Sequence, residues 1–351
     1  MVTDILNRYK KLVWPEIKKY LKDPTYPAGF ETPRKYKNII NFHWKTVKEY
    51  PLRKGKYLRP TLLLLTCGAL GGDAKNALKT AAAMQLSEDW LLAHDDFEDD
   101  SLERRGFPTL HRLYGNELAV NAGDALQIIM WKVLADNQKI LGSEKSYPLQ
   151  DEFHKILTRT ALGQAVEIKW TKDNKLNFDD SDWYFICDGK TSYYTIAGPM
   201  RLGAIIAGIK PRQLKVITRF GINLGRCFQI IDDVLDITSD FKGLKKQAGN
   251  DIYEGKRTVI LGHLLRSAKP DDRKKIIKIL SRGRGIKTQA EVDWIIKKMH
   301  EYKSIEYAKQ LAKKFKKSAQ KIFENEMKFL GKQPYRNHLS EIITFILERE
   351  Y

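Results

Sequence analysis

Apolar residues recur at intervals of three and four along almost the entire chain of 351 residues, whereas runs that alternate apolar and polar residues are scarce. Residues at that spacing share one face of an α-helix, while half-buried strands need the alternating pattern. The clearest sets are Ile5, Tyr9, Leu12 and Val13; Ile39, Phe42, Val47 and Tyr50; and Leu118, Ala122, Leu126, Ile129 and Val133. The sequence therefore predicts an all-α fold with many helices.

Glycine and proline interrupt the helical pattern at intervals suited to helix ends. The segment from Asp23 to Pro33 contains three prolines and a glycine, which predicts a loop after a first helix. Neither an internal repeat nor a Gly/Ser-rich linker marks a second domain. We therefore expect residues 1–351 to form a single domain, with a helical extension over residues 1–45 and the main bundle over residues 46–351.

The composition narrows the class of protein without choosing its partner. Hydrophobic residues make up 42% of the chain, enough for a packed core, which excludes intrinsic disorder. Lys and Arg (62) exceed Asp and Glu (43), a surplus that suits nucleic acid, an anionic membrane or an acidic small molecule. Three scattered cysteines give no disulfide framework, and the longest apolar run, Thr61–Leu70, is too short to span a bilayer. We expect a soluble, cytoplasmic protein.

Two clusters of aspartates share one spacing. The first contains Asp95, Asp96 and Asp99, and the second contains Asp232, Asp233 and Asp236. On a helix, carboxylates four residues apart stack on one face and destabilise it by a few tenths of a kcal/mol per pair, roughly. A hard divalent cation offsets that repulsion, and Mg²⁺ in particular is held by a few carboxylates together with substrate phosphates and water.

The repetition of the pattern is more informative than either cluster. One acidic helix face is most often only a solvated surface. If both helices face each other across a bundle cavity, however, the two clusters would hold metal ions around a diphosphate. Several basic segments provide matching cations for phosphate oxygens. These segments are Arg53–Pro60, Arg104–His111, Gly189–Thr191 and Gly255–Thr258.

The order of these motifs resembles that of the trans-isoprenyl diphosphate synthases, closest to the short-chain archaeal type that makes geranylgeranyl or farnesyl diphosphate. The resemblance extends from about Lys54 to Thr258, and Gly55-Lys56-Tyr57-Leu58-Arg59-Pro60 looks like the family's GKxxRP segment. It implies an all-α bundle around a deep central cavity, usually a homodimer. It also implies a Mg²⁺-dependent prenyltransferase that uses three ions to condense isopentenyl diphosphate with dimethylallyl, geranyl or farnesyl diphosphate.

The resemblance assigns roles to individual residues. The implied metal ligands are Asp95, Asp96, Asp99, Asp232 and Asp236, with Asp233 and Lys190 as further catalytic residues. The implied ligands of isopentenyl diphosphate are Lys56, Arg59 and Arg105. The implied ligands of the allylic diphosphate are Arg104, Lys190, Thr191, Gln229, Lys246 and Lys256. The backbone carbonyls of Lys190 and Thr191 would also stabilise the allylic carbocation.

Two positions just before the first cluster bear on substrate binding and on product length. Seven residues before Asp95 the family usually has His or Gln, but this chain has Glu88. Its carboxylate would repel a diphosphate unless it is turned away, protonated, or paired with a cation such as Lys56. Five residues before Asp95 the family places a bulky residue that limits the length of the product. Here that residue is Trp90, with Leu91 next, which favours a C20 product, with C15 as the second candidate.

The sequence leaves two other functions open. A class I terpene cyclase shares the first aspartate motif, but it usually carries N-D-x-x-S-x-x-x-E as its second motif, which this chain lacks. A non-catalytic basic binding subunit is a second alternative, although no nucleic-acid module is recognised and we expect no nucleic-acid partner. Most of the positive surplus lies after Leu264, which supports the hypothesis of transient association with an anionic membrane.

Overall fold

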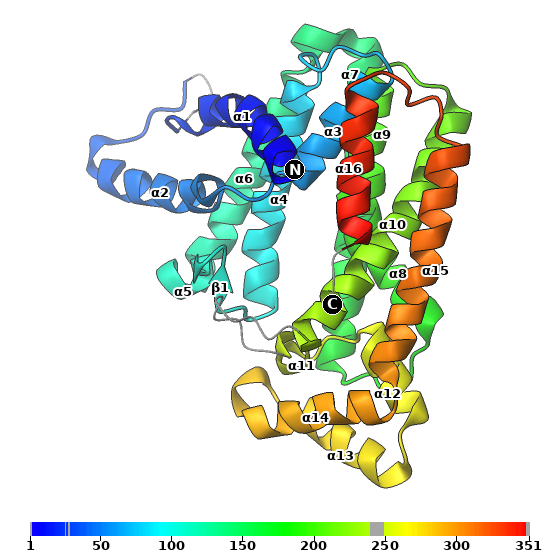
Figure 1. Ribbon diagram of the computed structural model, residues 1–351. Helices are drawn as coiled ribbons and strands as arrows, with labels where there is room; N and C mark the ends of the chain where they lie inside the picture. Colours follow the sequence, from blue (N-terminus) through cyan, green and yellow to red (C-terminus); the bar gives the residue numbers. More distant parts are fainter. Residues whose placement is uncertain (1, 25, 27–28, 239–248, 349–351) are drawn as a thin grey trace. The chain divides into compact units, whose positions relative to one another are not determined.

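A computed structural model describes residues 2–24, 26, 29–238 and 249–348. The chain is almost wholly helical, and the two strands found among the described residues are only two residues long (Figure 1). The predicted all-α fold is therefore confirmed. The described residues form two compact units, and the boundary between the units falls within helices α7 (Gln138–Lys172), α9 (Gly198–Ile206) and α16 (Tyr335–Leu347). The expectation of a single domain stays a prediction.

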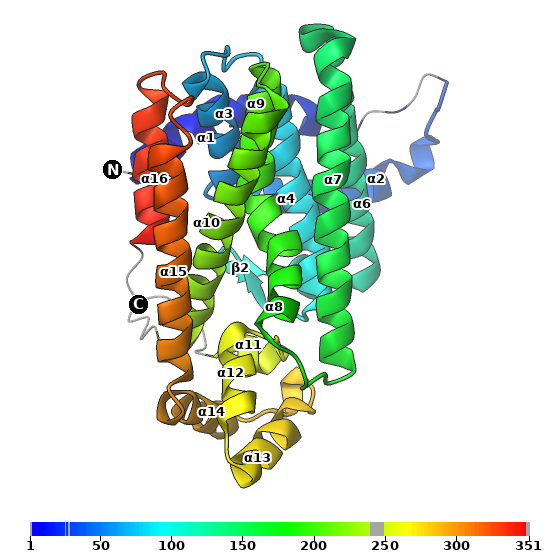
Figure 2. The ribbon, with the colours of Figure 1, turned by 90° about the vertical axis from the view of Figure 1, so that its right-hand side faces the viewer.

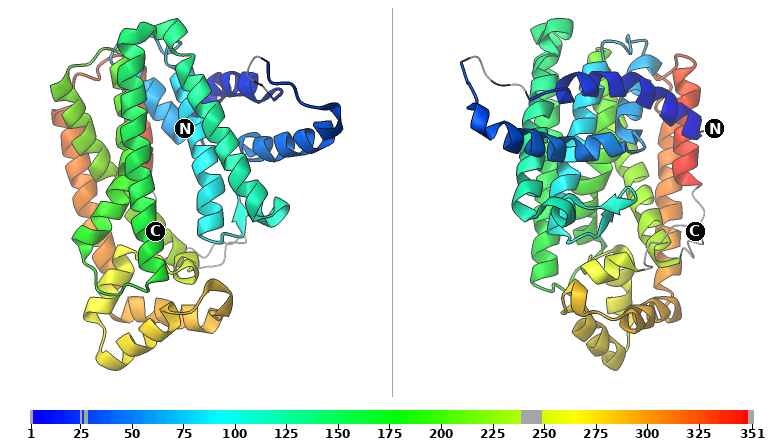
Figure 3. Two further views of the ribbon diagram at one scale, coloured as in Figure 1. Left: turned by 180° about the vertical axis from the view of Figure 1, so that it is seen from behind. Right: turned by 90° about the vertical axis from the view of Figure 1, so that its left-hand side faces the viewer.

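Unit 1 contains the described residues of Met1–Asp151, Leu202–Ile209 and Gly331–Leu339. Its elements are α1 (Val2–Leu21), η1 (Arg34–Tyr36), α2 (Lys37–Arg53), α3 (Leu58–Ala69), α4 (Leu78–Glu98), β1 (Glu103–Arg104), β2 (Phe107–Pro108), α5 (Leu110–Tyr114), α6 (Asn116–Ala135), the first part of α7, the second part of α9 and the first part of α16. Figure 3 shows the N-terminal helices α1 and α2 in blue. Between α1 and η1, the described residues 22–24, 26 and 29–33 form no helix, as the predicted loop requires.

Helix α4 is the centre of unit 1. It packs along α6 and also contacts α1 and α3. Its first half is buried on every side, as the complete burial of Ala81, Ala82 and Met84 shows, because small side chains let neighbouring helices approach closely. This packing fixes the direction of α4 and so fixes where its acidic C-terminal turn lies.

Unit 2 contains the described residues of Glu152–Arg201, Lys210–Leu330 and Ser340–Tyr351. Its elements are the second part of α7, α8 (Asp180–Cys187), η2 (Asp188–Ala197), the first part of α9, α10 (Pro211–Thr238), α11 (Asn250–Glu254), α12 (Val259–Ser267), α13 (Pro270–Leu280), η3 (Arg284–Ile286), α14 (Gln289–Glu301), α15 (Ser304–Asn325) and the second part of α16.

Helix α10 is the centre of unit 2, and it packs against α15 and η2 (Figure 2). Two glycines let η2 approach it. A Cβ atom on Gly225 would lie 2.3 Å from the Cα atom of Ser192, and one on Gly221 would lie 2.6 Å from Ala197. Because a side chain would not fit at either position, these glycines fix the distance between α10 and the π-helical segment η2.

The apolar periodicity predicted the helices better than it predicted which side chains are buried. Val47 and Tyr50 of α2 are fully buried, but Ile39 is 65% exposed and Phe42 is 47% exposed. Among the described residues, α6 is the one helix long and apolar enough to cross a membrane. It packs along α4 with Ala122 buried, as the core helix of a folded unit does.

Candidate active site

The first acidic cluster lies at the C-terminal end of α4, where its position is electrostatically unfavourable. Asp95 and Asp96 occupy the last turn, and Asp99 is the residue that ends the helix, with its N–H donating to the Asp95 carbonyl at 2.8 Å. The carbonyl end of a helix carries a partial negative charge, so three carboxylates there repel both the helix dipole and one another. Cations must therefore compensate this turn.

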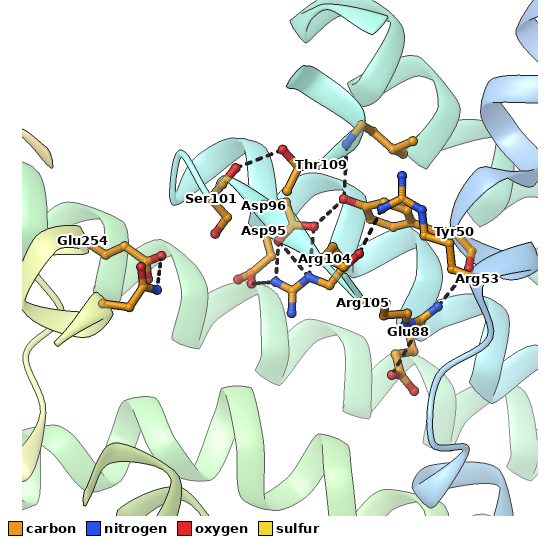
Figure 4. A network of polar contacts seen from close by, with 12 residues as sticks. Tyr50, Arg53, Glu88, Asp95, Asp96, Ser101, Arg104, Arg105, Thr109 and Glu254 are labelled. Atoms are coloured by element: carbon orange, nitrogen blue, oxygen red, sulfur yellow. Dashed lines mark hydrogen bonds and ion pairs between the residues drawn. The ribbon is translucent and has the colours of Figure 1, made fainter. Parts of the chain in front are cut away.

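A two-residue hairpin provides the first of these cations. Strands β1 and β2 pair antiparallel, with Arg104 opposite Phe107, so Arg105 and Gly106 form the turn. Both turn residues have positive φ, 55° and 79°, which is the conformation that a tight hairpin requires. Figure 4 shows the consequence: the Arg104 side chain extends to Asp96 and Asp95, whereas that of Arg105 extends to Glu88.

Asp96 is the buried member of the first cluster. Its side chain is inaccessible to solvent, and it accepts a hydrogen bond of 2.5 Å from the Tyr50 hydroxyl. The Arg104 Nε also donates to both of its oxygens, at 2.9 and 3.0 Å. Tyr50 in turn accepts from the Leu110 N–H, and burial beside Asp96 raises the pKa of Tyr50. Asp96 thus ties α4, α2 and the hairpin together, and its role as a metal ligand stays a prediction.

The basic segment between α2 and α3 has an unusual backbone conformation. Lys54 and Tyr57 both have positive φ, at 50° and 62°, although neither is a glycine. Residues in this region are strained and persist only when their surroundings fix them. Gly55 lies between them, and a Cβ atom there would lie 2.8 Å from the guanidinium of Arg105. The segment therefore passes close to the guanidinium of Arg105 at Gly55.

Glu88 is the anion that two of the basic residues share. Its carboxylate lies 3.2 Å from Arg59 and 3.4 Å from Arg105. The neighbouring Asp89 is buried, and its carboxylate lies 2.9 Å from Arg105. Burial raises the pKa of Asp89 to about 7, while Arg105 opposes this shift. Glu88 is thus paired with cations, which is one of the three arrangements expected from the sequence. The cations are Arg59 and Arg105.

The second acidic cluster lies near the C-terminal end of α10. Asp233 is buried, accepts a hydrogen bond of 2.7 Å from Gln229, and has a second oxygen with no hydrogen-bond partner among the described residues. Burial, followed by Asp251 and Asp232, raises the pKa of Asp233 well above its usual range. Asp236 accepts a hydrogen bond from the Asp251 N–H at 3.0 Å, which brings α11 to this cluster.

Helix α11 adds two acidic residues to which the sequence reasoning assigned no role. Burial and the nearby Asp236 raise the pKa of Asp251 to about 7. Glu254 lies 2.6 Å from Lys256 and 2.8 Å from Arg284, so it fixes both basic side chains. The two acidic residues are visible in the sequence segment Asn250–Glu254. Their burial, however, depends on neighbours that are distant in sequence.

The donor set of the second cluster suits a hard cation. Neighbouring carboxylates raise the pKa of both Asp233 and Asp251, and one Asp233 oxygen has no hydrogen-bond partner among the described residues. A divalent cation would relieve this repulsion. Over the part of the chain that the structure describes, no three His, Cys, Asp or Glu side chains form a ready-made metal site. Mg²⁺ fits such an arrangement, because it keeps several waters and binds substrate phosphates beside one or two carboxylates.

The π-helix η2 contains the predicted residues Lys190 and Thr191. The Lys190 ammonium lies 2.5 Å from Glu167, and the Thr191 hydroxyl donates to Gln229 at 2.8 Å. Because Gln229 also donates to Asp233, η2 is linked to the acidic cluster through one amide. π-Helical segments are rare and occur frequently at functional sites.

Trp90 lies one turn before the first cluster on α4. It is 9% exposed, and its indole lies edge-on to the ring of His94 with 6.2 Å between centroids. His94 in turn fits against Gly123 of α6, where a Cβ atom would approach its ring within 2.4 Å. Leu91, the other residue predicted to limit product length, is partly exposed. These contacts place Trp90 at the packed α4–α6 face.

The structure therefore groups the predicted residues in two sets. Unit 1 contains Lys56, Arg59, Trp90, Leu91, Asp95, Asp96, Asp99, Arg104 and Arg105. Unit 2 contains Lys190, Thr191, Gln229, Asp232, Asp233, Asp236 and Lys256. Lys246 lies outside the described residues. Asp89, Glu167, Asp251 and Glu254 are buried or partly buried acidic neighbours that the sequence reasoning did not assign to the site.

An all-α chain whose carboxylate clusters adjoin fixed arginines and lysines has the parts of an enzyme that binds diphosphates with Mg²⁺. Residues 43–299 match the family described as polyprenyl synthetase. The chain belongs to this family, and it is a trans-prenyltransferase, as the sequence predicted.

Individual relatives agree with this assignment. The geranylgeranyl diphosphate synthase of Saccharolobus solfataricus is 32% identical over 283 residues, which cover 80% of this chain and 83% of the relative. The short chain isoprenyl diphosphate synthase of Methanothermobacter thermautotrophicus is 31% identical over 351 residues, covering 100% and 99%. The crystal structure of geranylgeranyl pyrophosphate synthetase from Pyrococcus horikoshii has a TM-score of 0.82 at 30% identity, covering 99% of each chain.

Proposed function

We propose that this enzyme condenses isopentenyl diphosphate with an allylic diphosphate, head to tail and in the all-trans configuration. Its main product would be C20 geranylgeranyl diphosphate, with C15 farnesyl diphosphate as the second candidate. The observation that carries the proposal is the hairpin that sends Arg104 to the aspartate cluster and Arg105 to the group around Glu88. The side chains of two consecutive arginines thus extend to two separate groups of carboxylates. This separation would place one arginine at each of the two diphosphates that the reaction requires.

In unit 1, the consecutive residues Arg104 and Arg105 would bind different substrates. Arg104 would bind the allylic diphosphate beside Asp95 and Asp99, which would hold Mg²⁺. Arg59 and Arg105 would bind the diphosphate of isopentenyl diphosphate, together with Lys56. Arginine suits this task because its planar fork donates two parallel hydrogen bonds to phosphate oxygens.

In unit 2, the proposed ligands of the allylic diphosphate are held by acidic neighbours. Glu167 orients Lys190, and Glu254 orients Lys256. Asp232 and Asp236 would hold Mg²⁺, while Gln229 links Thr191 to Asp233. Lys246 would complete the set, as the resemblance implies.

The chemistry transfers one prenyl group. The C1–O bond of the allylic diphosphate breaks, and its electron pair leaves with the diphosphate. The C4 atom of isopentenyl diphosphate attacks C1, and the proton lost from C2 passes to the released diphosphate. Asp95, Asp99, Asp232 and Asp236 would hold Mg²⁺, in the proposed number of three ions, which would neutralise the diphosphate and make it a better leaving group. The carbonyls of Lys190 and Thr191 would stabilise the positive charge that develops at C1.

The remaining properties are proposed from the family. The enzyme would act as a homodimer in the cytoplasm, with dimethylallyl, geranyl or farnesyl diphosphate as primer. The excess of Lys and Arg after Leu264 would favour transient contact with an anionic membrane surface, where long prenyl products partition. No nucleic acid would be a partner.

Incubation with labelled isopentenyl diphosphate, each allylic primer in turn and Mg²⁺ tests the proposal. Chromatography of the dephosphorylated products should show mainly the C20 alcohol from every primer, and no product when EDTA is present. A cyclised hydrocarbon formed from an allylic diphosphate alone would instead identify a terpene cyclase. The absence of any new carbon–carbon bond would overturn the proposed reaction.

Glu88 would compete with the diphosphate of isopentenyl diphosphate for Arg59 and Arg105. Replacing Glu88 by Gln keeps the size of the side chain but removes the charge paired with Arg59 and Arg105. We expect the KM for isopentenyl diphosphate to fall by about three- to tenfold, a gain of up to about 1.4 kcal/mol in binding. Initial rates at saturating allylic substrate measure this change.

Glu49→Gln is the matched control for Glu88→Gln, because it releases Arg53, a neighbouring arginine paired at 3.1 Å. That variant should leave the KM for isopentenyl diphosphate unchanged. An unchanged or higher KM in Glu88→Gln would show that the Glu88 carboxylate does not compete with the substrate and serves to position the arginines.

A further inference from the structure

The N-terminal helix α1 reaches the basic segment that follows α2. The Lys10 ammonium donates a hydrogen bond of 3.3 Å to the carbonyl oxygen of Gly55. It also lies 5.9 Å from the centre of the Tyr57 ring. One turn further along α1, the centre of the Trp14 ring lies 4.8 Å from the Lys54 ammonium. A helix at the start of the chain thus contacts both ends of this segment.

Core packing, and not Lys10, determines where α1 lies. Val13 and Ile17 are completely buried, and Tyr9 is 4% exposed. The helix packs against α3 and α4. Since these apolar contacts are independent of the ammonium group, Lys10 is held at the segment by the fold and can be replaced without removing the contacts that anchor the helix.

Lys10 lies within a concentration of positive charge. Burial lowers the pKa of Lys10, and the nearby Lys54 and Arg105 lower it further. Arg59 belongs to the same group, because it shares the Glu88 carboxylate with Arg105. Cations gathered at this density repel one another, and the carboxylates of Glu88 and Asp89 offset only part of that charge. The arrangement therefore suits a further anionic ligand with several negative charges.

We propose that Lys10 is a further ligand of the diphosphate of isopentenyl diphosphate, supplied by the N-terminal extension. An ammonium has three N–H donors, so Lys10 can keep its bond to Gly55 and direct the other two to phosphate oxygens. Lys10 lies outside the family match at residues 43–299, so the extension would be part of the substrate site. The inference rests on the proposed function.

The test uses the affinity of the full-length protein for isopentenyl diphosphate, measured by calorimetry in EDTA. Without Mg²⁺, the binding of this diphosphate depends on the protein's own cations. Lys10→Met should weaken binding by about tenfold, the effect of losing one charge-assisted contact. Lys10→Arg should restore most of the affinity. Lys11→Met is the matched control, since Lys11 is the exposed neighbour on the same helix, and it should bind as the wild type does.

Steady-state kinetics separate binding from a structural role. Lys10→Met should raise the KM for isopentenyl diphosphate while leaving kcat, the KM for the allylic substrate and the unfolding temperature close to those of the wild type. Wild-type affinity in Lys10→Met would overturn the inference, as would equal weakening in Lys11→Met. A wild-type protein that forms no new carbon–carbon bond from isopentenyl diphosphate in the presence of Mg²⁺ would overturn the proposed function, and this inference with it.

Discussion

Replacing Asp95 by Asn should lower kcat/KM for the allylic substrate by about a thousandfold or more, which is about 4 kcal/mol of lost transition-state stabilisation. Asp95 lies in the last turn of α4, with its side chain 24% exposed and its carboxylate 3.9 Å from Arg104. An amide of the same size removes the charge that would hold Mg²⁺ while disturbing little of the packing. The unfolding temperature should therefore change by only a few degrees.

Asp96→Asn is the matched control, because the two aspartates are adjacent but differ in environment. Asp96 is fully buried between Tyr50 and Arg104, so removing its charge breaks a buried ion pair. We expect a loss of about 2 kcal/mol in the free energy of unfolding, below the value for a fully buried pair, because Arg104 is 30% exposed. Urea unfolding and initial rates of both variants measure these effects. An active Asp95→Asn enzyme, or one as unstable as Asp96→Asn, would contradict this division of roles.

The helices and their acidic turns were predictable from the sequence because both depend on local spacing. Residues three and four apart share a helix face whatever the rest of the chain does. The prediction that Asp95 and Asp99 stack therefore needed only one turn of helix, and the structure shows the Asp99 N–H bonded to the Asp95 carbonyl. Helix α4 and the helix that contains Asp236 were predictable for the same reason.

Burial was not predictable, because it depends on which element covers a helix face. Leu12 shares the apolar pattern of Val13, but it is 47% exposed whereas Val13 is completely buried. The same limit applies to Asp89, a residue of α4. Nothing in the sequence indicates that this acidic residue is buried beside Arg105. Tertiary packing decides these positions, and it decides the pKa of the buried carboxylates with them.

The separation of Arg104 and Arg105 is the part of the site that sequence reasoning alone did not derive. The resemblance to the family assigned the two residues to different substrates, but two adjacent basic residues have no inherent reason to diverge. The physical reason is the turn: Arg105 adopts a positive φ, and the chain reverses between β1 and β2. The sequence contains one hint of this conformation, the glycine at position 106, which readily adopts positive φ.

Replacing Trp90 by Ala should change the main product from C20 to chains longer by one or more five-carbon units. Trp90 is 9% exposed, and its indole nitrogen has no hydrogen-bond partner among the described residues, so its role is to fill space. Removing the ring opens a cavity next to His94 at the α4–α6 face. Chromatography of dephosphorylated products, with farnesyl diphosphate as primer, measures the chain length.

Leu91→Ala and Trp90→Phe distinguish a stopper from a residue that only stabilises the core. On an ideal helix Leu91 lies on the Asp95 face and Trp90 lies away from it, so longer products from Leu91→Ala alone would transfer the role to Leu91. Trp90→Phe should give an intermediate product distribution, because it removes only part of the volume. Trp90→Ala should also lose about 3 kcal/mol of stability, since a buried aromatic leaves a cavity behind. A destabilised Trp90→Ala enzyme that still stops at C20 would show that Trp90 packs the core without limiting chain growth.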